Sequence, residues 1–293
     1  MNLAKPVAAL LLALLLPGCK KPEPAPPSQK PPDSLRQLDQ LSVEQRRVFL
    51  RGFAGDWRGD TDMGRGLPEP PASLPVPEDA RTVDLPDPET LELGKLPVSE
   101  AIARRRSRRE FTEAALTLEQ FTYLLVHTQG ITGEQKTDAG ELTHQFRAAP
   151  SGGGRYPLET FLAVQRVDGL TPGLYRYLPE RHRLLVVAED PGIGEKLQQA
   201  CYNNATIGDS AAVFIWAAVP YRSEWKYGCI AHKMVALEAG HVCQNLYLAT
   251  ESIGAGTCAM LGYHQPLLDE LIGADGEEVF TIYLAAVGKL LHP

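Results

Sequence analysis

The residues of this chain that could do chemistry include a dense group of arginines. Residues 104–109 read Arg-Arg-Arg-Ser-Arg-Arg, which puts five guanidinium groups in six positions. Like charges this close repel one another, whereas each guanidinium can hold a phosphate through paired hydrogen bonds, and a serine hydroxyl can add another. This arginine segment therefore indicates either a phosphate site or a solvated basic face.

Two glycine-rich segments could bring backbone close to a flat ligand. The first, residues 147–159, reads RAAPSGGGRYPLE, and the second, residues 254–263, reads GAGTCAMLGY. Glycine lets the backbone approach a ring because it has no side chain, and the exposed N–H groups can reach ring oxygens or nitrogens. For the first segment, a flexible loop that binds nothing is the alternative.

Several other kinds of site are disfavoured by composition and motifs. The 293 residues carry a net charge of −7, so we expect no nucleic-acid partner, because binding phosphodiesters needs a cationic surface. The sequence has no GxSxG, P-loop or HExxH motif. Its five cysteines form no CxxC pair and its seven histidines show no metal-ligand spacing, so we expect no metal site.

The first nineteen residues have the layout of a secretory signal. Lys5 precedes an apolar run at residues 7–16, and the Leu-Pro-Gly-Cys that follows resembles a bacterial lipobox ending at Cys19. We therefore expect residues 1–19 to be a lipoprotein-type signal peptide with Cys19 as the lipidated residue. The exported protein would then be anchored to a bacterial membrane, on its periplasmic or cell-surface side. An N-terminal core helix is the alternative.

A tether is expected next, over residues 20–88. Many prolines lie here among polar residues, which favours an extended, semi-rigid spacer. A short helix is predicted within it at residues 42–53, where Ser42 and Gln45 could form a capping box. The folded body would then span residues 89–293.

Hydrophobic periodicity divides this body into helices and strands. Residues 117–127 begin with Thr-Leu-Glu-Gln, a capping box. Residues 211–219, AAVFIWAAV, are continuously apolar, which suits a strand buried on both faces. Further helices are predicted at 97–106 (capped by Ser99), 193–201 and 266–272, and further strands at 160–167, 173–177, 183–188 and 279–287. This order predicts an α+β fold with a mostly antiparallel central sheet flanked by helices.

One long helix is predicted over residues 228–253. Apolar residues form two stripes on it, so it should be buried on two sides, at the centre of the domain or in a subunit interface. His241 and Asn245 lie four residues apart on one face, and we expect both to satisfy buried polar groups.

Taken in order, these segments resemble the nitroreductase superfamily, in its SagB-type dehydrogenase branch. The Arg-Arg-Ser-x-Arg of residues 105–109 is similar to that family's FMN-phosphate segment, and Pro-Ser-Gly-Gly at 150–153, leading into Tyr-Pro-Leu-Glu, is similar to the flavin-ring loop. Residues 238–241, 244–249 and 253–258 are similar to the branch's long helix and the loop after it. The resemblance covers about residues 90–289.

This resemblance implies an FMN-binding homodimer with each flavin at the subunit interface. Carried over by position, the residues of the phosphate and ribityl–pyrimidine side would be Arg105, Arg106, Ser107 and Arg109, with Lys289 as the only basic residue of the C-terminal tail that could help. The residues along the isoalloxazine would be Pro150, Ser151, Gly152 and Gly153. Backbone N–H groups near flavin N5 would come from Leu261 and Gly262.

A Lys-Tyr pair precedes the long helix in the azoline-oxidising members of this branch, and Lys226 and Tyr227 stand at that place here. Removing a hydride from carbon also requires a base for the neighbouring proton, which a desolvated lysine or tyrosine can supply. The resemblance thus implies a catalytic role for this pair. A surface lysine beside a packing tyrosine is the alternative.

The sequence as a whole favours an FMN-dependent oxidoreductase that transfers hydride between the flavin and an unknown small molecule or peptide. The alternative is a redox-inactive protein of the same fold that serves as a binding or scaffold lipoprotein. An intact phosphate segment favours the enzyme, because a scaffold needs no phosphate site. The short basic tail and the export signal favour the scaffold.

Overall fold

The computed structural model describes residue 40, residues 42–50 and residues 61–291. The expected signal peptide and Cys19 lie outside this part of the chain. Within it, no helix has both the length and the apolar character needed to cross a membrane. Ser42 and Gln45 form the predicted capping box at the start of helix α2 (Val43–Arg46), which continues as the 3-10 turn η1 (Arg47–Leu50).

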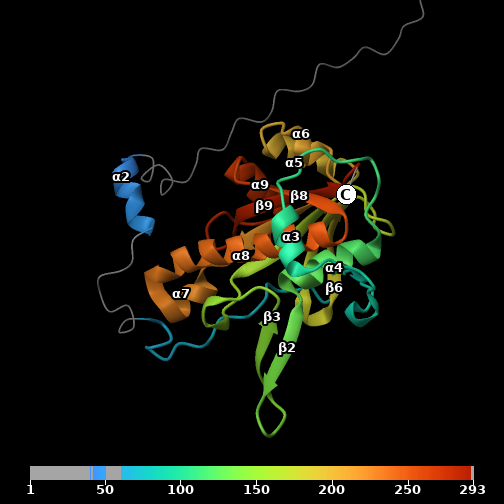
Figure 1. Cartoon of the computed structure of the whole chain (residues 1–293). Coiled ribbons are helices and arrows are strands. Elements are labelled where there is room, and N and C mark those ends of the chain that lie inside the picture. Colours follow the sequence, from blue (N-terminus) through green and yellow to red (C-terminus); the bar gives the residue numbers. More distant parts are fainter. Residues whose placement is uncertain (1–39, 41, 51–60, 292–293) are drawn as a thin grey trace, which may run out of the picture.

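A seven-stranded sheet forms the centre of the fold, in the order β1-β6-β5-β4-β7-β9-β8 (Figure 1). Every neighbouring pair in it is antiparallel, which confirms the predicted α+β class. The strands are β1 (Thr82–Asp84), β4 (Leu158–Val164), β5 (Gly173–Leu178), β6 (Arg183–Glu189), β7 (Ala212–Ala218), β8 (Ala255–Met260) and β9 (Phe280–Lys289). A separate hairpin, β2 (Ile131–Lys136) with β3 (Leu142–Arg147), projects from the body (Figure 1).

Helices cover both faces of this sheet. The α-helices of the body are α3 (Val98–Arg104), α4 (Leu118–Gln129), α5 (Ile193–Ala200), α6 (Ala205–Gly208), α7 (Tyr221–Tyr227), α8 (Ala231–Ser252) and α9 (Gln265–Ile272). On β7, Phe214 and Trp216 pack with α4 and α8, whereas Val213 and Ile215 pack with α5 and α9. Strand side chains alternate between faces, so a strand covered on both sides must be apolar throughout. The continuous apolar run therefore forms strand β7, which is buried on both faces as predicted.

Some local predictions were wrong. Helix α3 has Pro97 at its N-cap, with Ser99 already inside the helix. Residues 255–260 form the edge strand β8, where we expected a glycine-rich loop, because pairing with β9 outweighs their low intrinsic strand preference. Helix α7 and the β2–β3 hairpin were not predicted at all.

The packed body also begins earlier than residue 89. Strand β1 pairs with β6 at the sheet edge, although its residues fall in the expected tether. Residues 61–75, here called the arm, are held on the body by buried side chains. Leu74 N–H donates to the Glu159 carboxylate at 2.8 Å, and the Arg176 guanidinium donates to Pro75 O at 2.8 Å. A Pro-rich segment can be bound this way because proline keeps its carbonyl acceptor.

Candidate functional site

The arginine segment, residues 104–109, leaves α3 and runs along strand β8. Ser107 forms a parallel bridge with Thr257, and Arg108 N–H donates to Thr257 O at 2.9 Å. On one side of the segment, Ser107 Oγ lies 2.9 Å from the Tyr247 hydroxyl, and the Arg105 guanidinium lies 5.2 Å from the centre of the Tyr247 ring. The predicted phosphate residues Arg105 and Ser107 thus share one side, directed to α8.

Arg106 is separated from this pair. Its backbone N–H donates to Glu251 Oε1 at 3.2 Å, and the Arg108 guanidinium lies 3.6 Å from the same oxygen. Together with Arg104, these two arginines line a cavity of about 700 Å³. Successive side chains of an extended segment point to opposite sides, so Arg106 is separated from Arg105 and Ser107, whereas Arg109 belongs on their side and its guanidinium donates to Ser107 O at 3.4 Å.

A glycine permits this close contact between the arginine segment and the sheet. A Cβ on Gly256 would lie 2.7 Å from Arg108 Cβ and 2.7 Å from Leu290 Cδ2, which is closer than carbon atoms pack. Lys289 pairs with Ala255 next to this contact, and its carbonyl accepts from Thr112 N–H at 2.9 Å. The structure therefore brings the arginine segment and the backbone of Lys289 to one sheet edge.

Leu261 and Gly262 follow at the other end of β8. Tyr263 N–H donates to Leu261 O at 3.2 Å in a tight turn, and Leu261 is 71% exposed. Four residues separate Thr257 from Leu261, which corresponds to about 13 Å along a strand. The sheet edge thus offers basic groups at one end and exposed backbone at the other, as a long ligand with a phosphate at one end would require.

The glycine loop, residues 150–156, has a rigid and strained backbone. Tyr156 N–H donates to Ser151 Oγ at 2.8 Å, and Gly154 N–H donates to Ser151 O at 3.1 Å. Gly153 has φ 63°, and Tyr156 has φ 46°, a conformation that residues with side chains rarely adopt. Such strain persists only where the surroundings impose it, which is common at ligand sites.

This loop is pressed against α7 and α8. A Cβ on Gly152 would overlap the methyl group of Met234, and a Cβ on Gly153 would overlap the Tyr227 hydroxyl. The Lys226 ammonium lies 5.7 Å from the centre of the Tyr227 ring. The structure therefore brings Tyr227, one of the two predicted catalytic residues, to the loop that was predicted to lie along the flavin ring, and Lys226 lies beside Tyr227.

The arm holds α7 in this position. Met63 N–H donates to Trp225 O at 2.8 Å, the Trp225 indole N–H donates to Leu67 O at 2.9 Å, and the Tyr221 hydroxyl donates to Asp62 at 2.9 Å. Below these contacts, the Arg222 guanidinium is 1% exposed and binds both Glu159, at 2.5 Å, and Pro71 O, at 3.0 Å. No spacing pattern indicates this support, because Arg222 and Glu159 are 63 positions apart in sequence and Tyr221 and Asp62 are 159 apart.

One functional candidate was missed. Glu238 belongs to the segment of α8 that resembles the family, and the motif alone assigns it no role of its own. It is 4% exposed and lies one helical turn after Met234, against whose methyl group Gly152 packs. Burial raises its pKa to about 7, against the opposite effects of Ser151, Arg147 and the Gly152 backbone, which favour the carboxylate. A perturbed carboxyl beside a predicted ligand loop marks a site candidate.

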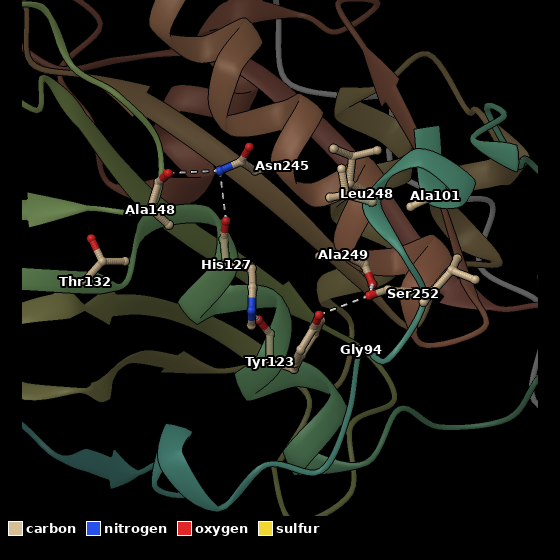
Figure 2. A pocket seen from close by; sticks show the side chains of 12 residues that line it. Gly94, Ala101, Tyr123, His127, Thr132, Ala148, Asn245, Leu248, Ala249 and Ser252 are labelled. Atoms are coloured by element: carbon tan, nitrogen blue, oxygen red, sulfur yellow. Dashed lines mark hydrogen bonds between the residues drawn. The ribbon is translucent and has the colours of Figure 1, made fainter. Parts of the chain in front are cut away.

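Asn245 connects α8 with α4 and with the chain just before the glycine loop. Its Nδ2 donates to His127 O at 3.0 Å and to Ala148 O at 3.3 Å, as Figure 2 shows. This confirms the expectation for Asn245, whereas His241 is exposed within the described chain. Asn245 borders a cavity of about 350 Å³ between α3, α4 and α8, where the Tyr123 hydroxyl lies 3.1 Å from Ser252 Oγ.

Within one chain, the glycine loop and the arginine segment lie at different levels of α8. The loop contacts α8 at Met234, and the arginine segment contacts it at Tyr247. These two residues are thirteen positions apart on the helix, which corresponds to about 20 Å along its axis.

Comparison with known proteins gives consistent matches. Residues 102–289 match the model of the nitroreductase family. A Methanocaldococcus jannaschii protein whose name assigns it to the nitroreductases is 31% identical over 214 residues, which are 73% of this chain and 99% of that protein. The Escherichia coli microcin B17-processing protein McbC is 25% identical over 154 residues, which are 49% of this chain and 54% of McbC.

Solved structures share the fold. A Ralstonia eutropha protein described as a nitroreductase superposes with a TM-score of 0.58 and 23% identity, over 78% of this chain and 100% of that one. An Anabaena variabilis protein with the same description gives 0.58 and 21%, over 72% of this chain and 42% of that one. A chain of the Escherichia coli microcin synthetase McbBCD complex, with truncated pro-MccB17 bound, gives 0.55 and 21%, over 73% and 79%.

Proposed function

Because the chain belongs to the nitroreductase family, we propose that it is an FMN-dependent oxidoreductase that transfers hydride between the flavin and a small molecule or peptide. The observation that carries this proposal is the sheet edge at β8, where the arginine segment lies against the strand beside Lys289 and the exposed Leu261 follows at the far end.

The residues present suit FMN. Arg105 and Arg109 would bind the phosphate dianion, to which guanidinium groups donate paired, charge-assisted hydrogen bonds. Ser107, fixed by the Tyr247 hydroxyl, would orient the adjoining part of the ligand. Leu261 and Gly262 would offer N–H groups to the ring. When bound, FMN supplies the two-electron redox chemistry, while the protein binds, orients and excludes water.

A homodimer would complete this site. The glycine loop and the arginine segment of one chain are displaced along α8, so a second copy would supply the loop to the site that the first copy begins. Apolar side chains that a second copy could cover are exposed on α3 and α8: Val98 is 68% exposed, Ile102 55% and Leu237 57%. Leu237 on the predicted second stripe of α8 is thus uncovered within the described chain, together with Val98 and Ile102 of α3, as a subunit interface would require.

The SagB-type branch is the finer assignment that we propose. The similarity to McbC supports it, as does the position of Tyr227 against Gly153. Lys226 and Tyr227 would accept or return the proton that accompanies hydride transfer. The signal-like first nineteen residues support an exported enzyme that a lipid on Cys19 anchors to the membrane.

A Tyr227→Phe variant tests this function. Compared with the wild type, the variant should bind FMN equally well but reduce or oxidise it roughly 100-fold or more slowly in the presence of substrate, because general acid–base groups contribute that much. Tyr202→Phe is a matched control, since Tyr202 is 67% exposed and remote from the loop in sequence. Equal rates for wild type and Tyr227→Phe would remove the catalytic role. A wild-type chain that binds no FMN would favour the scaffold lipoprotein.

A further inference from the structure

The arginine segment has a second side, which the proposed function does not use. This side opens on a cavity of about 700 Å³ near the end of α8, here called the arginine cavity. The basic and apolar side chains that line it include Arg104, Arg106, Arg108, Leu96 and Leu290. Many small-molecule sites have volumes of about 300–1,000 Å³. Because Arg105 faces Tyr247 instead, the arginine cavity is separate from the proposed FMN-phosphate side.

Arg108 is fixed in position, while its guanidinium lacks an acceptor. Its side chain lies so close to Gly256 that a Cβ on this glycine would be 2.7 Å from Arg108 Cβ and 2.9 Å from Arg108 Cγ. Among the described residues, no hydrogen-bond partner reaches its Nε atom, which is buried. The Glu251 carboxylate lies 3.6 Å from its Nη2 atom, which is beyond hydrogen-bond distance. Nearly all buried donors in folded proteins are paired, so Arg108 calls for an acceptor that the described residues do not supply.

Arg106 brings a second guanidinium to the arginine cavity. Its Nη1 atom donates to Ala103 O at 3.1 Å and to Arg105 O at 2.7 Å, at the end of α3. Its Nε and Nη2 atoms donate to no acceptor in the part of the chain that the structure describes. Arg106 and Arg108 are therefore guanidinium groups with donors left for a ligand.

Charges around the arginine cavity leave a positive surplus. Arg104 is paired with Glu100 on α3. Glu251 lies 3.6 Å from Arg108 and accepts from Arg106 N–H at 3.2 Å. Three guanidinium groups thus face two carboxylates within the described residues, which leaves one positive charge for an anion to balance. Guanidinium groups bind phosphate oxygens through paired hydrogen bonds, and the leucines on the wall suit an apolar or ring-shaped group attached to the phosphate.

We propose that the arginine cavity binds the phosphate group of an organic ligand, at a site separate from that of FMN. Arg106 and Arg108 would donate hydrogen bonds to the phosphate oxygens, and Leu96 and Leu290 would pack against the organic part of the ligand. A nucleotide and a phospholipid headgroup both present such a phosphate ester. The site goes beyond the proposed function and does not depend on it, because binding a phosphate here needs no flavin chemistry.

Isothermal titration calorimetry of the purified full chain, with FMN added to saturation and no phosphate in the buffer, tests this site. The probes are inorganic phosphate, AMP and the soluble short-chain lipid dihexanoyl phosphatidylglycerol. We expect AMP or the lipid to bind, one molecule per chain, more tightly than inorganic phosphate. Tighter binding of AMP identifies a nucleotide as the source of the phosphate, and tighter binding of the lipid identifies a headgroup. If neither organic probe binds, the proposal is wrong.

Substitutions around the arginine cavity locate the bound probe. Arg106→Gln and Arg108→Gln should each weaken its binding about 10- to 100-fold, because each removes charge-assisted hydrogen bonds. Arg181→Gln, a control at an exposed arginine of the 3-10 turn η5 (Pro179–Arg181), should leave it unchanged. Glu251→Gln should tighten it about fivefold, since a carboxylate about 4 Å from an anion repels it by about that factor in water. A merely destabilised protein would not gain affinity. Equal affinities in wild type, Arg106→Gln and Arg108→Gln would overturn the proposal.

Arg105→Ala separates this site from the proposed FMN site. This variant should lose affinity for FMN and keep its affinity for the organic phosphate. If Arg105→Ala loses both ligands, the two sides of the arginine segment form one site and the inference fails, while the oxidoreductase assignment stands. If the wild type binds no FMN but binds an organic phosphate through Arg106 and Arg108, the oxidoreductase assignment fails and the arginine cavity remains a phosphate site.

Discussion

The buried carboxyl of Glu238 makes the stability of the protein depend on pH in a way that one substitution should remove. Its pKa lies at about 7 in the folded chain against an ordinary value of 4.5, which an unfolded chain would show. The difference of 2.5 units, at about 1.4 kcal/mol per unit, corresponds to about 3 kcal/mol. Because the folded state holds the proton more tightly, this contribution is fully present below pH 4.5 and is lost as the pH rises through about 7.

Urea unfolding of wild type and Glu238→Gln at a series of pH values measures this effect. Glutamine has the same shape and does not titrate, so the free energy of unfolding of the wild type, relative to that of the variant, should fall by about 3 kcal/mol between pH 4.5 and 7.5. Glu195→Gln, a control at an exposed position on α5, should show no such trend. A difference between wild type and Glu238→Gln that stays constant across this range would refute the reasoning.

Three further substitutions test other parts of the structure. Arg105→Ala should weaken FMN binding about 10- to 100-fold in a fluorescence titration, and more than Arg106→Ala does, because of these two arginines only Arg105 lies on the Tyr247 side. Equal losses of affinity in the two variants would contradict the placement of Arg105 and Arg106 on opposite sides of the arginine segment. Trp225→Phe should lower the free energy of unfolding by about 1–2 kcal/mol, since it removes the hydrogen bond to Leu67 O that ties the arm to α7; an unchanged urea midpoint would argue that the arm is dispensable. Cys19→Ala should move the protein from membrane to soluble fractions, and unchanged membrane association would remove the lipid anchor.

The fold was predictable where local pattern and tertiary environment agree. The apolar run of β7 specifies burial on both faces, and Thr117 with Gln120 specifies the start of α4, so both were predicted from sequence. Strand β8 was missed because its small residues carry little strand preference and become a strand by pairing with β9. The position of β1 at the sheet edge was missed because three residues are too few to show a periodicity.

The segments that form the candidate site could be predicted from the sequence, whereas their arrangement in space could not. Motifs marked the arginine segment and the glycine loop, but only the structure shows that Arg106 lines a cavity with Arg104 and Arg108, whereas the Arg105 guanidinium lies over the Tyr247 ring. It also shows that Arg222 anchors the arm under α7, a contact between distant residues that no spacing rule detects. The sequence places Glu238 in a helix motif but does not show its burial, because that depends on how the rest of the chain packs on α8.

An absorption spectrum of the purified full chain, with the released ligand identified by mass, tests the central claim most directly. We predict a yellow protein that releases FMN, one molecule per chain, and an Arg105→Ala variant that is purified with little or none. A colourless wild-type protein that also fails to bind added FMN would contradict the oxidoreductase assignment and leave a redox-inactive binding lipoprotein of the same fold.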